Sequence, residues 1–307
     1  MAVTAAMVKE LRELSGAGMS ACKNALVEAS GDMARAVEVL REKGLAAAAK
    51  KAGRIAAEGL VMVALSSDRK SGAIVEVNSE TDFVAKNEDF VNFVKNVAAQ
   101  ALNSGAGSIE EMLSEKWTAD PSVTMQDVLT QKIATIGENI GVRRFERYNA
   151  PAGRLVVDYI HGGGRVGVML EMQADTASDA VIEAGRNVCM QIAAMSPQFL
   201  DRNSVATDYL DKEREILTQQ TMAEGKPANI AEKMVEGRLN KMLKEICLVD
   251  QEYVKDGELS VGQYLETVAK AVGGKLAVTK FVRYEKGEGI EKKEENFAEE
   301  VSKAMQG

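Results

Sequence analysis

Histidine and cysteine, which many enzymes and metal sites use, are scarce in this chain of 307 residues. His161 is the single histidine, and three cysteines at positions 22, 189 and 247 are too few and too widely spaced for a zinc site or a disulfide framework. Three glycines follow His161, as in lipase oxyanion loops, but the Gly-x-Ser-x-Gly elbow and later histidine of such enzymes are missing. No Gly-x-x-x-x-Gly-Lys phosphate loop occurs either. The sequence therefore argues against an enzyme and against a bound cofactor or metal.

An excess of positive charge and long apolar runs are also absent. The net charge is −8, with 38 basic against 46 acidic side chains, which argues against a protein that binds nucleic acid mainly through its phosphates. No apolar run approaches the length of a membrane span, and no signal peptide precedes the first helix. We therefore expect a cytoplasmic protein that contacts neither nucleic acid nor a membrane directly.

Aromatic residues make up only 5% of the chain, although 46% of it is hydrophobic, so we expect a core of aliphatic side chains packed between helices. The pattern of residues 1–54 predicts a separate unit of three helices followed by a short helical linker at 45–53. Thr4 can cap the first helix, the second spans 19–30, and the third spans 33–43 and ends at Gly44 as a C′ glycine. Such a small unit usually docks onto another protein, and the alternative is a purely structural cap.

From about residue 56 the pattern changes to strands, and the sequence repeats itself. A shift of 95 positions without gaps aligns four pairs: 60–63 with 155–158, Gly72 with Gly167, 75–78 with 170–173, and 97–99 with 192–194. Each copy has the pattern strand, turn, strand, helix. The sequence therefore predicts an α+β fold with a core of two ββα units, whose helices pack on a sheet.

Residues 81–87, Thr-Asp-Phe-Val-Ala-Lys-Asn, join the strand and the helix of the first copy. Thr81, Asp82 or Asn87 could cap the helix, because a short oxygen-bearing side chain accepts from the free N–H groups of a first turn. Capping does not explain Phe83, whose ring either fills the core or points outward as an anchor for a partner. In the gapless alignment the second copy has Thr-Ala-Ser at 176–178, without the acid and the ring, and both interpretations of Phe83 stay open.

The remaining segments complete a division of the chain into five parts. Residues 204–246 predict a helical hairpin with a narrow apolar seam, broken at 225–227, and a short amphipathic tail containing Phe297 follows the last strand. The predicted parts are the N-terminal domain 1–54, one core subdomain 55–150, a second core subdomain 151–203 and 247–285, the hairpin insertion 204–246, and a C-terminal module 286–307.

Several stretches, in this order, resemble the translation elongation factor Ts family along nearly the whole chain. They are residues 11–23, 81–87, 136–140, 230–238 and 287–292. The resemblance implies a ubiquitin-associated-like N-terminal domain, two related core subdomains, a coiled-coil protrusion and a short C-terminal helix. It also implies guanine nucleotide exchange on the GTPase elongation factor Tu, without covalent chemistry, as a dimer or a heterotetramer with that partner.

By this resemblance, Thr81, Asp82, Phe83 and Val84 enter elongation factor Tu beside its nucleotide, displace Mg²⁺, distort the site and promote release of GDP. Further contacts with the partner are expected from four other residues: Arg12, Met19, His161 and Phe297. Ser20 departs from the larger residue that some relatives carry, within the N-terminal contact surface. The alternative function is a chaperone or scaffold that binds the same GTPase without exchanging its nucleotide.

Overall fold

The structure is a computed structural model that describes residues 3–225 and 228–291, and it has the predicted α+β class. The chain divides into two compact units. Of the described residues, one unit contains 3–62, 75–145 and 285–291, and the other contains 63–74, 146–225 and 228–284. The predicted C-terminal helix with Phe297 lies outside the described residues. The division into five parts stays a prediction.

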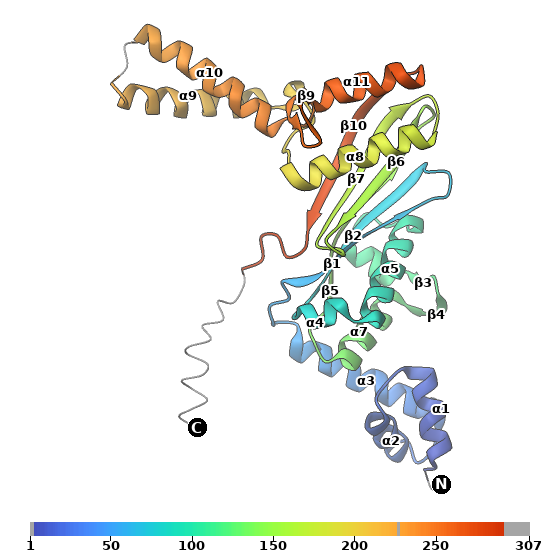
Figure 1. The fold of residues 1–307 in the computed structure, drawn as a ribbon. Coiled ribbons are helices and arrows are strands. Elements are labelled where there is room, and N and C mark those ends of the chain that lie inside the picture. The colour runs from blue at the N-terminus through green and yellow to red at the C-terminus, as the bar shows by residue number, and fades with distance from the viewer. Residues whose placement is uncertain (1–2, 226–227, 292–307) are drawn as a thin grey trace. The chain divides into compact units, whose positions relative to one another are not determined.

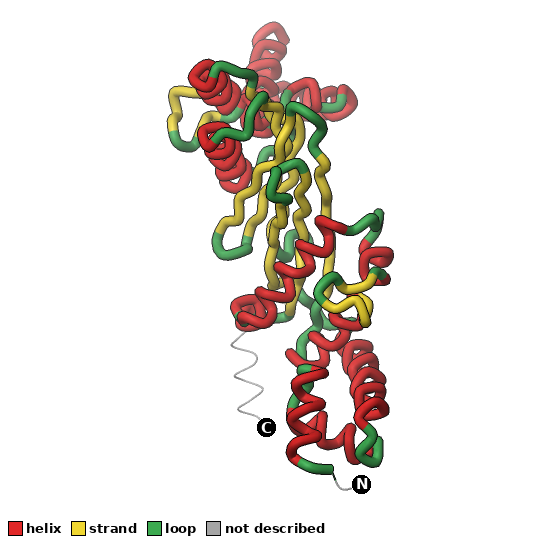
Figure 2. The backbone as a smooth tube through the Cα atoms, turned by 90° about the vertical axis from the view of Figure 1, so that its right-hand side faces the viewer, coloured by secondary structure: helices red, strands yellow, loops and turns green. Residues whose placement is uncertain are grey.

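The first three helices form a small bundle, with short loops between them (Figures 1 and 2). These helices are α1 (Ala5–Ser15), α2 (Met19–Glu28) and α3 (Met33–Lys51). The Thr4 side chain caps α1 by accepting from the Met7 amide, and Asp32 caps α3 by accepting from the Arg35 amide. Buried side chains from all three helices fill the centre of the bundle: Val8, Leu11, Cys22, Ala25, Leu26, Ala29, Ala36 and Val39.

The predicted end of the third helix at Gly44 is wrong, because α3 continues to Lys51. Its second half packs on α7 (Met125–Ile136), and the side chains of Thr130 and Ala134 lie 3.7 Å from the place where a Cβ of Gly44 would be. An interior glycine destabilises a helix by about 1 kcal/mol relative to alanine. Packing on a neighbouring helix offsets that penalty, since most helical stability in proteins comes from tertiary contacts.

The core is built from two copies of one arrangement. The first copy, residues 58–149, contains β1 (Glu58–Leu65), β2 (Ser71–Ser79), α4 (Asp82–Lys86), α5 (Glu88–Asn103), α6 (Ile109–Ser114), β3 (Lys116–Trp117), β4 (Asp120–Thr124), α7 and β5 (Gly141–Asn149). Its larger sheet has the order β1-β2-β5, and β3 pairs with β4 in a separate antiparallel hairpin.

The second copy, residues 154–285, repeats this order with a long addition after its first helix. It contains β6 (Arg154–His161), β7 (Val166–Ala174), α8 (Asp179–Met195), a 3₁₀ turn (Arg202–Ser204), α9 (Thr207–Ala223), α10 (Ala228–Ile246), a second 3₁₀ turn (Leu248–Asp250), β8 (Glu252–Tyr253), β9 (Asp256–Ser260), α11 (Val261–Val272) and β10 (Leu276–Glu285). The sheet order is β10-β7-β6, with Arg154 opposite Gln173 and His161 opposite Val166. Helix α8 packs on β6 and β7.

The repeat is longer than the predicted ββα unit, because the hairpin, helix and last strand of each copy also correspond. Helices α7 and α11 both begin with a capping box, Thr124 with Asp127 and Ser260 with Gln263, and both end at a left-handed glycine. These positions differ by 136 residues in each case. The two copies therefore share a three-stranded sheet, two corresponding helices and a small β-hairpin.

The gapless alignment of the long helices at 97–99 and 192–194 is wrong by one helical turn. The buried residues of α5 are 90, 93, 94, 97, 98, 100 and 101, and those of α8 are 181, 184, 185, 188, 189, 191 and 192. The helices thus correspond at a shift of 91, whereas β2 and β7 correspond at 95. The first copy therefore has four more residues between strand and helix, and α4 lies in this interval.

Helices α9 and α10 run side by side as the predicted helical hairpin (Figure 1). At its base, Val205, Leu239, Leu243 and Cys247 form a buried apolar cluster. Phe199 and Cys247 pair in a parallel β-bridge, so the chain leaves and re-enters the core at one place. None of the helices within 3–225 and 228–291 has the length and apolarity needed to cross a membrane.

Candidate partner-binding site

The strand-to-helix junction of the first copy is held by two helix caps in succession. The Thr81 hydroxyl accepts from the Val84 amide at 3.3 Å and begins α4. Asn87 then ends α4 in extended conformation, and its side chain accepts from the amides of Asp89 and Phe90 at 2.8 and 3.4 Å to begin α5. Of the three predicted caps, Thr81 and Asn87 cap helices, and Asp82 is the first residue of α4. The caps limit α4 to one short turn with defined ends.

Phe83 points away from the core, and 81% of its surface is exposed. This fraction is higher than that of any other large apolar side chain in the described part of the chain. Ala85, in the same turn, is buried, and so is Phe90 at the start of α5. Of the two interpretations of Phe83, the one in which its ring points outward is confirmed, and the one in which it fills the core is wrong. Val84 is half-buried beside it.

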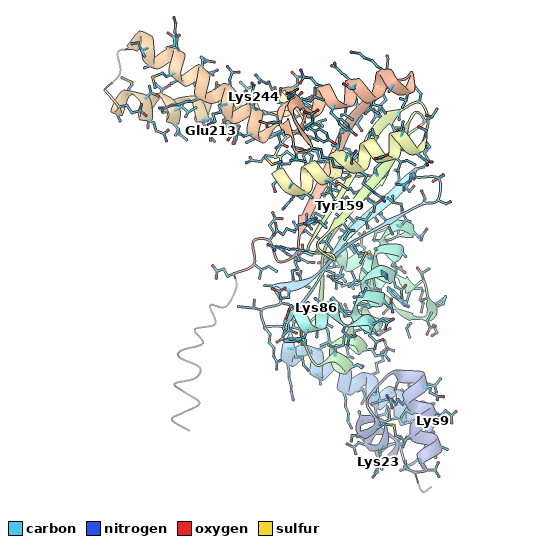
Figure 3. The ribbon with its side chains drawn as sticks, viewed as in Figure 1. Lys9, Lys23, Lys86, Tyr159, Glu213 and Lys244 are labelled. Atoms are coloured by element: carbon cyan, nitrogen blue, oxygen red, sulfur yellow. The ribbon has the colours of Figure 1, made fainter. Side chains whose placement is uncertain are left out.

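Opposite charges flank the exposed ring. The Asp82 carboxylate accepts a hydrogen bond from the Lys86 ammonium at 2.6 Å, one helical turn later, and Figure 3 marks Lys86 at the end of α4. This hydrogen bond, with weaker attraction from Lys86 and Lys286, holds the pKa of Asp82 below its usual value. The carboxylate is therefore charged at neutral pH. Because the pair is exposed, little free energy is needed to separate its two charges.

Residues distant in sequence support the junction from the core side. The Glu80 carboxylate accepts from the backbone amide of Asn139 at 2.6 Å, and the Asn139 side chain donates to the Arg54 carbonyl at 2.7 Å. Glu138 binds the backbone of Glu80 and Thr81. Residues 136–140 belong to a stretch that carried the family resemblance, but sequence alone gave them no role, since no local pattern links positions nearly 60 apart.

The other predicted contact residues lie on different elements. Arg12 is exposed near the end of α1, and Met19, 49% exposed, begins α2 in the same bundle. His161 is exposed at the end of β6, where the three glycines that follow it turn the chain with positive φ angles. Phe297 lies outside the described residues. The structure thus brings Thr81 to Val84 into one turn of helix and leaves the roles of all eight residues as proposals.

Tyr159 accompanies His161 on the second copy and was missed by the sequence analysis. Its hydroxyl lies 2.9 Å from Nδ1 of His161, and the two ring centroids are 5.8 Å apart. Tyr159 also packs on the apolar core of the second copy. The signal was present in the sequence, because residues two apart on a strand share one face.

The arrangement at the junction suits non-covalent binding. Within the described ranges, no three His, Cys, Asp or Glu side chains come together as a metal site. What the junction offers is an aromatic ring, exposed yet fixed at its base by hydrogen bonds, with one carboxylate and one ammonium beside it. Such a group can be inserted into a complementary pocket of a partner with little loss of conformational entropy.

Comparison with known proteins adds evidence on ancestry. A family model described as elongation factor TS matches residues 80–288. The chain is 57% identical to elongation factor Ts of Clostridium perfringens (strain 13 / Type A), over 98% of both chains. It is 54% identical to elongation factor Ts of Clostridium novyi (strain NT) and 53% identical to that of Clostridium acetobutylicum, over 99% of each chain in both cases.

Proposed function

Because this chain belongs to the elongation factor Ts family, and is therefore an elongation factor of translation, we propose that it is a guanine nucleotide exchange factor for elongation factor Tu. It binds elongation factor Tu–GDP in the cytoplasm and promotes the release of GDP. No covalent step is needed. What is needed is a negative coupling free energy between this chain and the nucleotide, and such coupling acts equally in both directions.

The magnitude required is modest for a protein interface. Weakening the affinity for GDP a thousandfold corresponds to about 4 kcal/mol. Burial of one phenylalanine side chain supplies about 1.5–3 kcal/mol, which can be used to distort the partner's nucleotide site. The observation that carries the proposal is the 81% exposure of Phe83 on a turn that is capped at both ends. A ring held in this way is ready to insert.

Asp82 has a separate task in the proposed mechanism. A GTPase holds GDP through its phosphate loop and Mg²⁺, which neutralises phosphate charge. The Asp82 carboxylate, next to the inserted ring, disturbs the electric field and the hydrogen bonds around that metal and so favours its displacement. Separation from Lys86 frees the carboxylate for this contact. Arg12, Met19, His161 and Phe297 are proposed to add contact area that holds the complex while GDP leaves.

A variant in which the junction of the second copy replaces that of the first tests this proposal. Because strands and helices correspond at shifts of 95 and 91, residues 175–178 of the second copy can replace residues 80–87 of the first. We expect the native chain to accelerate the release of fluorescent GDP from purified elongation factor Tu. The exchanged variant should fold and lose this acceleration.

Two outcomes would contradict the proposal. A native chain that binds elongation factor Tu without faster GDP release would be a scaffold or chaperone instead. A folded variant that keeps full exchange activity would show that the Asp82–Phe83 turn is not the active element. Circular dichroism and thermal unfolding of the variant establish that it is folded before its kinetics are interpreted.

A further inference from the structure

We propose that Glu138 is a positioning residue for exchange, which acts by fixing the backbone from which Asp82 and Phe83 project. This inference rests on the proposed function of the junction. Glu138 follows the left-handed Gly137 that ends α7, and it is half-buried. It reaches a segment nearly 60 residues earlier in the chain.

The Glu138 carboxylate uses both oxygens on the junction. Oε2 accepts from the backbone amides of Glu80 and Thr81 at 3.1 and 3.0 Å. Oε1 accepts from the Thr81 hydroxyl at 2.6 Å. That hydroxyl gives its proton to Glu138 and keeps a lone pair for the Val84 amide, which it caps at 3.3 Å. One carboxylate therefore sets both the strand end and the cap of α4.

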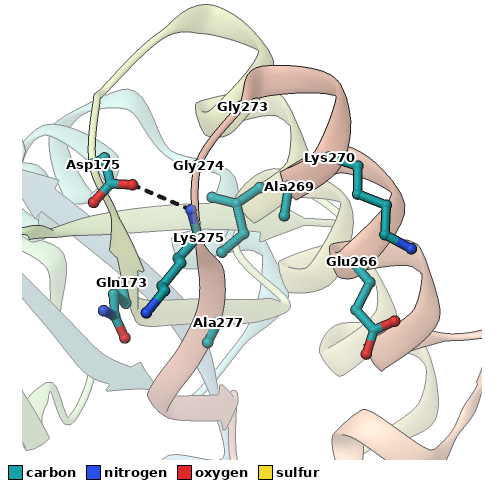
Figure 4. Close-up of a pocket in the computed structure, with 10 residues that line it drawn as sticks. Gln173, Asp175, Glu266, Ala269, Lys270, Gly273, Gly274, Lys275 and Ala277 are labelled. Carbon is teal, nitrogen blue, oxygen red and sulfur yellow. Dashed lines mark hydrogen bonds between the residues drawn. The ribbon is translucent and has the colours of Figure 1, made fainter.

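The second copy provides an internal comparison. There, the Asp175 carboxylate accepts from the backbone amide of Lys275 at 3.2 Å, as Glu80 accepts from Asn139 in the first copy (Figure 4). The hydrogen bond from this backbone amide to an acidic side chain is thus common to both copies. At the shift of 136 that relates α7 to α11, Gly274 stands in the place of Glu138, and a Cβ there would lie 2.9 Å from Asp175. The second copy folds without a carboxylate at this position.

Glu138 therefore occurs only in the copy that also has α4, Asp82 and Phe83. If it served the common fold, the second copy would need an equivalent group. Its three hydrogen bonds all end on residues 80 and 81, directly before the exposed turn. We infer that they keep the turn ordered before the partner arrives, so that less conformational entropy is lost when Phe83 inserts.

A double-mutant cycle tests this inference, because it measures whether two residues act through one another. We expect Glu138→Ala to slow maximal GDP release about tenfold in the native background and to have almost no further effect in a Phe83→Ala background. Glu138→Gln, which keeps the volume and one acceptor, should be intermediate. Glu111→Ala is the matched control, since Glu111 also accepts from a loop amide, that of Gly107 at 2.7 Å.

Hydrogen exchange in the free protein supplies a second readout that does not depend on elongation factor Tu. The amides of Glu80 and Thr81 should exchange faster in Glu138→Ala than in the native chain, while the core amides of β7 stay protected. Equal slowing of GDP release with and without Phe83, or unchanged exchange of these two amides, would overturn the inference. If the native chain did not accelerate the release of GDP from elongation factor Tu, only the proposed function would be refuted. The hydrogen exchange of the Glu80 and Thr81 amides would still test whether Glu138 orders the turn.

Discussion

Asp82 and Phe83 are adjacent residues with different surroundings, and we expect their substitutions to have different kinetic effects. The Asp82 carboxylate is charged and paired with Lys86, and its side chain is 47% exposed, so its replacement removes mainly an electrostatic effect. Asp82→Ala should slow Mg²⁺-dependent GDP release about tenfold, within the range of a charged contact, and should weaken binding to nucleotide-free elongation factor Tu less. Stopped-flow release with and without Mg²⁺, beside calorimetric binding, checks this. If the rate of GDP release and the affinity for nucleotide-free elongation factor Tu fell by the same factor, Asp82 would contribute to binding in general and not to displacement of Mg²⁺.

His161 and Tyr159 permit a second prediction for single residues. Because His161 is exposed, His161→Ala should leave the melting temperature nearly unchanged, yet it should slow exchange roughly fivefold, or about 1 kcal/mol, if it contacts the partner. Tyr159→Phe removes only the hydroxyl that lies 2.9 Å from Nδ1, and it should reproduce part of this effect. Thermal unfolding and GDP release of both variants are the measurements. A large loss of stability with normal exchange would instead make His161 structural.

Among the elements, the hairpin of α9 and α10 is predicted to be dispensable for basic exchange. The side chains of Arg214 and Glu236 lie 3.2 Å apart across the two helices, so residues 215–235 can be replaced by a short Gly/Ser turn that preserves the apolar base. The shortened chain should retain most of its GDP release. Loss of nearly all activity in a folded shortened chain would refute this expectation.

The removed part carries three exposed apolar side chains, Ile216, Met222 and Ile230, of which Met222 is 65% exposed. If these side chains serve assembly, a change in oligomeric state accompanies the deletion. Sedimentation of the native and shortened chains measures it.

The central strand of each sheet carries a buried glutamate at the corresponding position. Glu76 accepts from Arg143, Arg144 and the backbone amide of Gly287. Glu171 accepts from Arg154 and Thr279. Burial acts to raise the pKa of Glu76, but hydrogen bonds from Gly287 and Asn78, with the attraction of Arg144, outweigh it, so the net pKa lies below 4.5. Glu76 therefore contributes stability above about pH 4.5, and this contribution is lost as the pH falls through its lower folded-state pKa.

Glu76→Gln should lower the free energy of unfolding by about 3 kcal/mol at neutral pH, since it leaves a buried ionic cluster incomplete. It should also reduce the loss of stability on acidification that we expect of the native chain below about pH 4.5. Denaturant unfolding from neutral to acidic pH measures both effects. Glu28→Gln is the control, because Glu28 pairs with Lys43 at the surface and should contribute under about 1 kcal/mol. An unchanged pH profile in Glu76→Gln would contradict the account.

For the molecule as a whole, the sequence predicts those features well that depend only on neighbouring residues, such as helix caps and the apolar faces of helices. Thr4 correctly predicts the cap of α1, and the pattern of 204–246 correctly predicts the helical hairpin of α9 and α10. The local pattern gives the wrong helix end at Gly44, because contacts with α7 stabilise α3 beyond this glycine. Whether a glycine ends a helix depends on contacts that lie elsewhere in the sequence.

The repeat likewise shows that the sequence alone does not define the candidate site. A gapless comparison detects the duplicated strands, but it cannot reveal that the helices follow at a different shift. Burial of corresponding positions in the fold shows that the first copy has four additional residues between strand and helix, in the interval that contains α4. From the sequence, the missing ring in the second copy leaves the exposure of Phe83 undecided, because it is compatible with a ring in the core or at the surface. The Glu138 contact cannot be predicted at all, since it joins positions nearly 60 residues apart.

The measurement that tests the central claim most directly is GDP release beside thermal unfolding for Phe83→Ala. A side chain that is 81% exposed contributes little to the fold, so the variant should lose far less than the roughly 3–5 kcal/mol expected for a core phenylalanine. Loss of an inserted anchor should slow GDP release from elongation factor Tu about thirtyfold or more, equivalent to about 2 kcal/mol. A severe loss of stability together with undiminished GDP release would contradict the account.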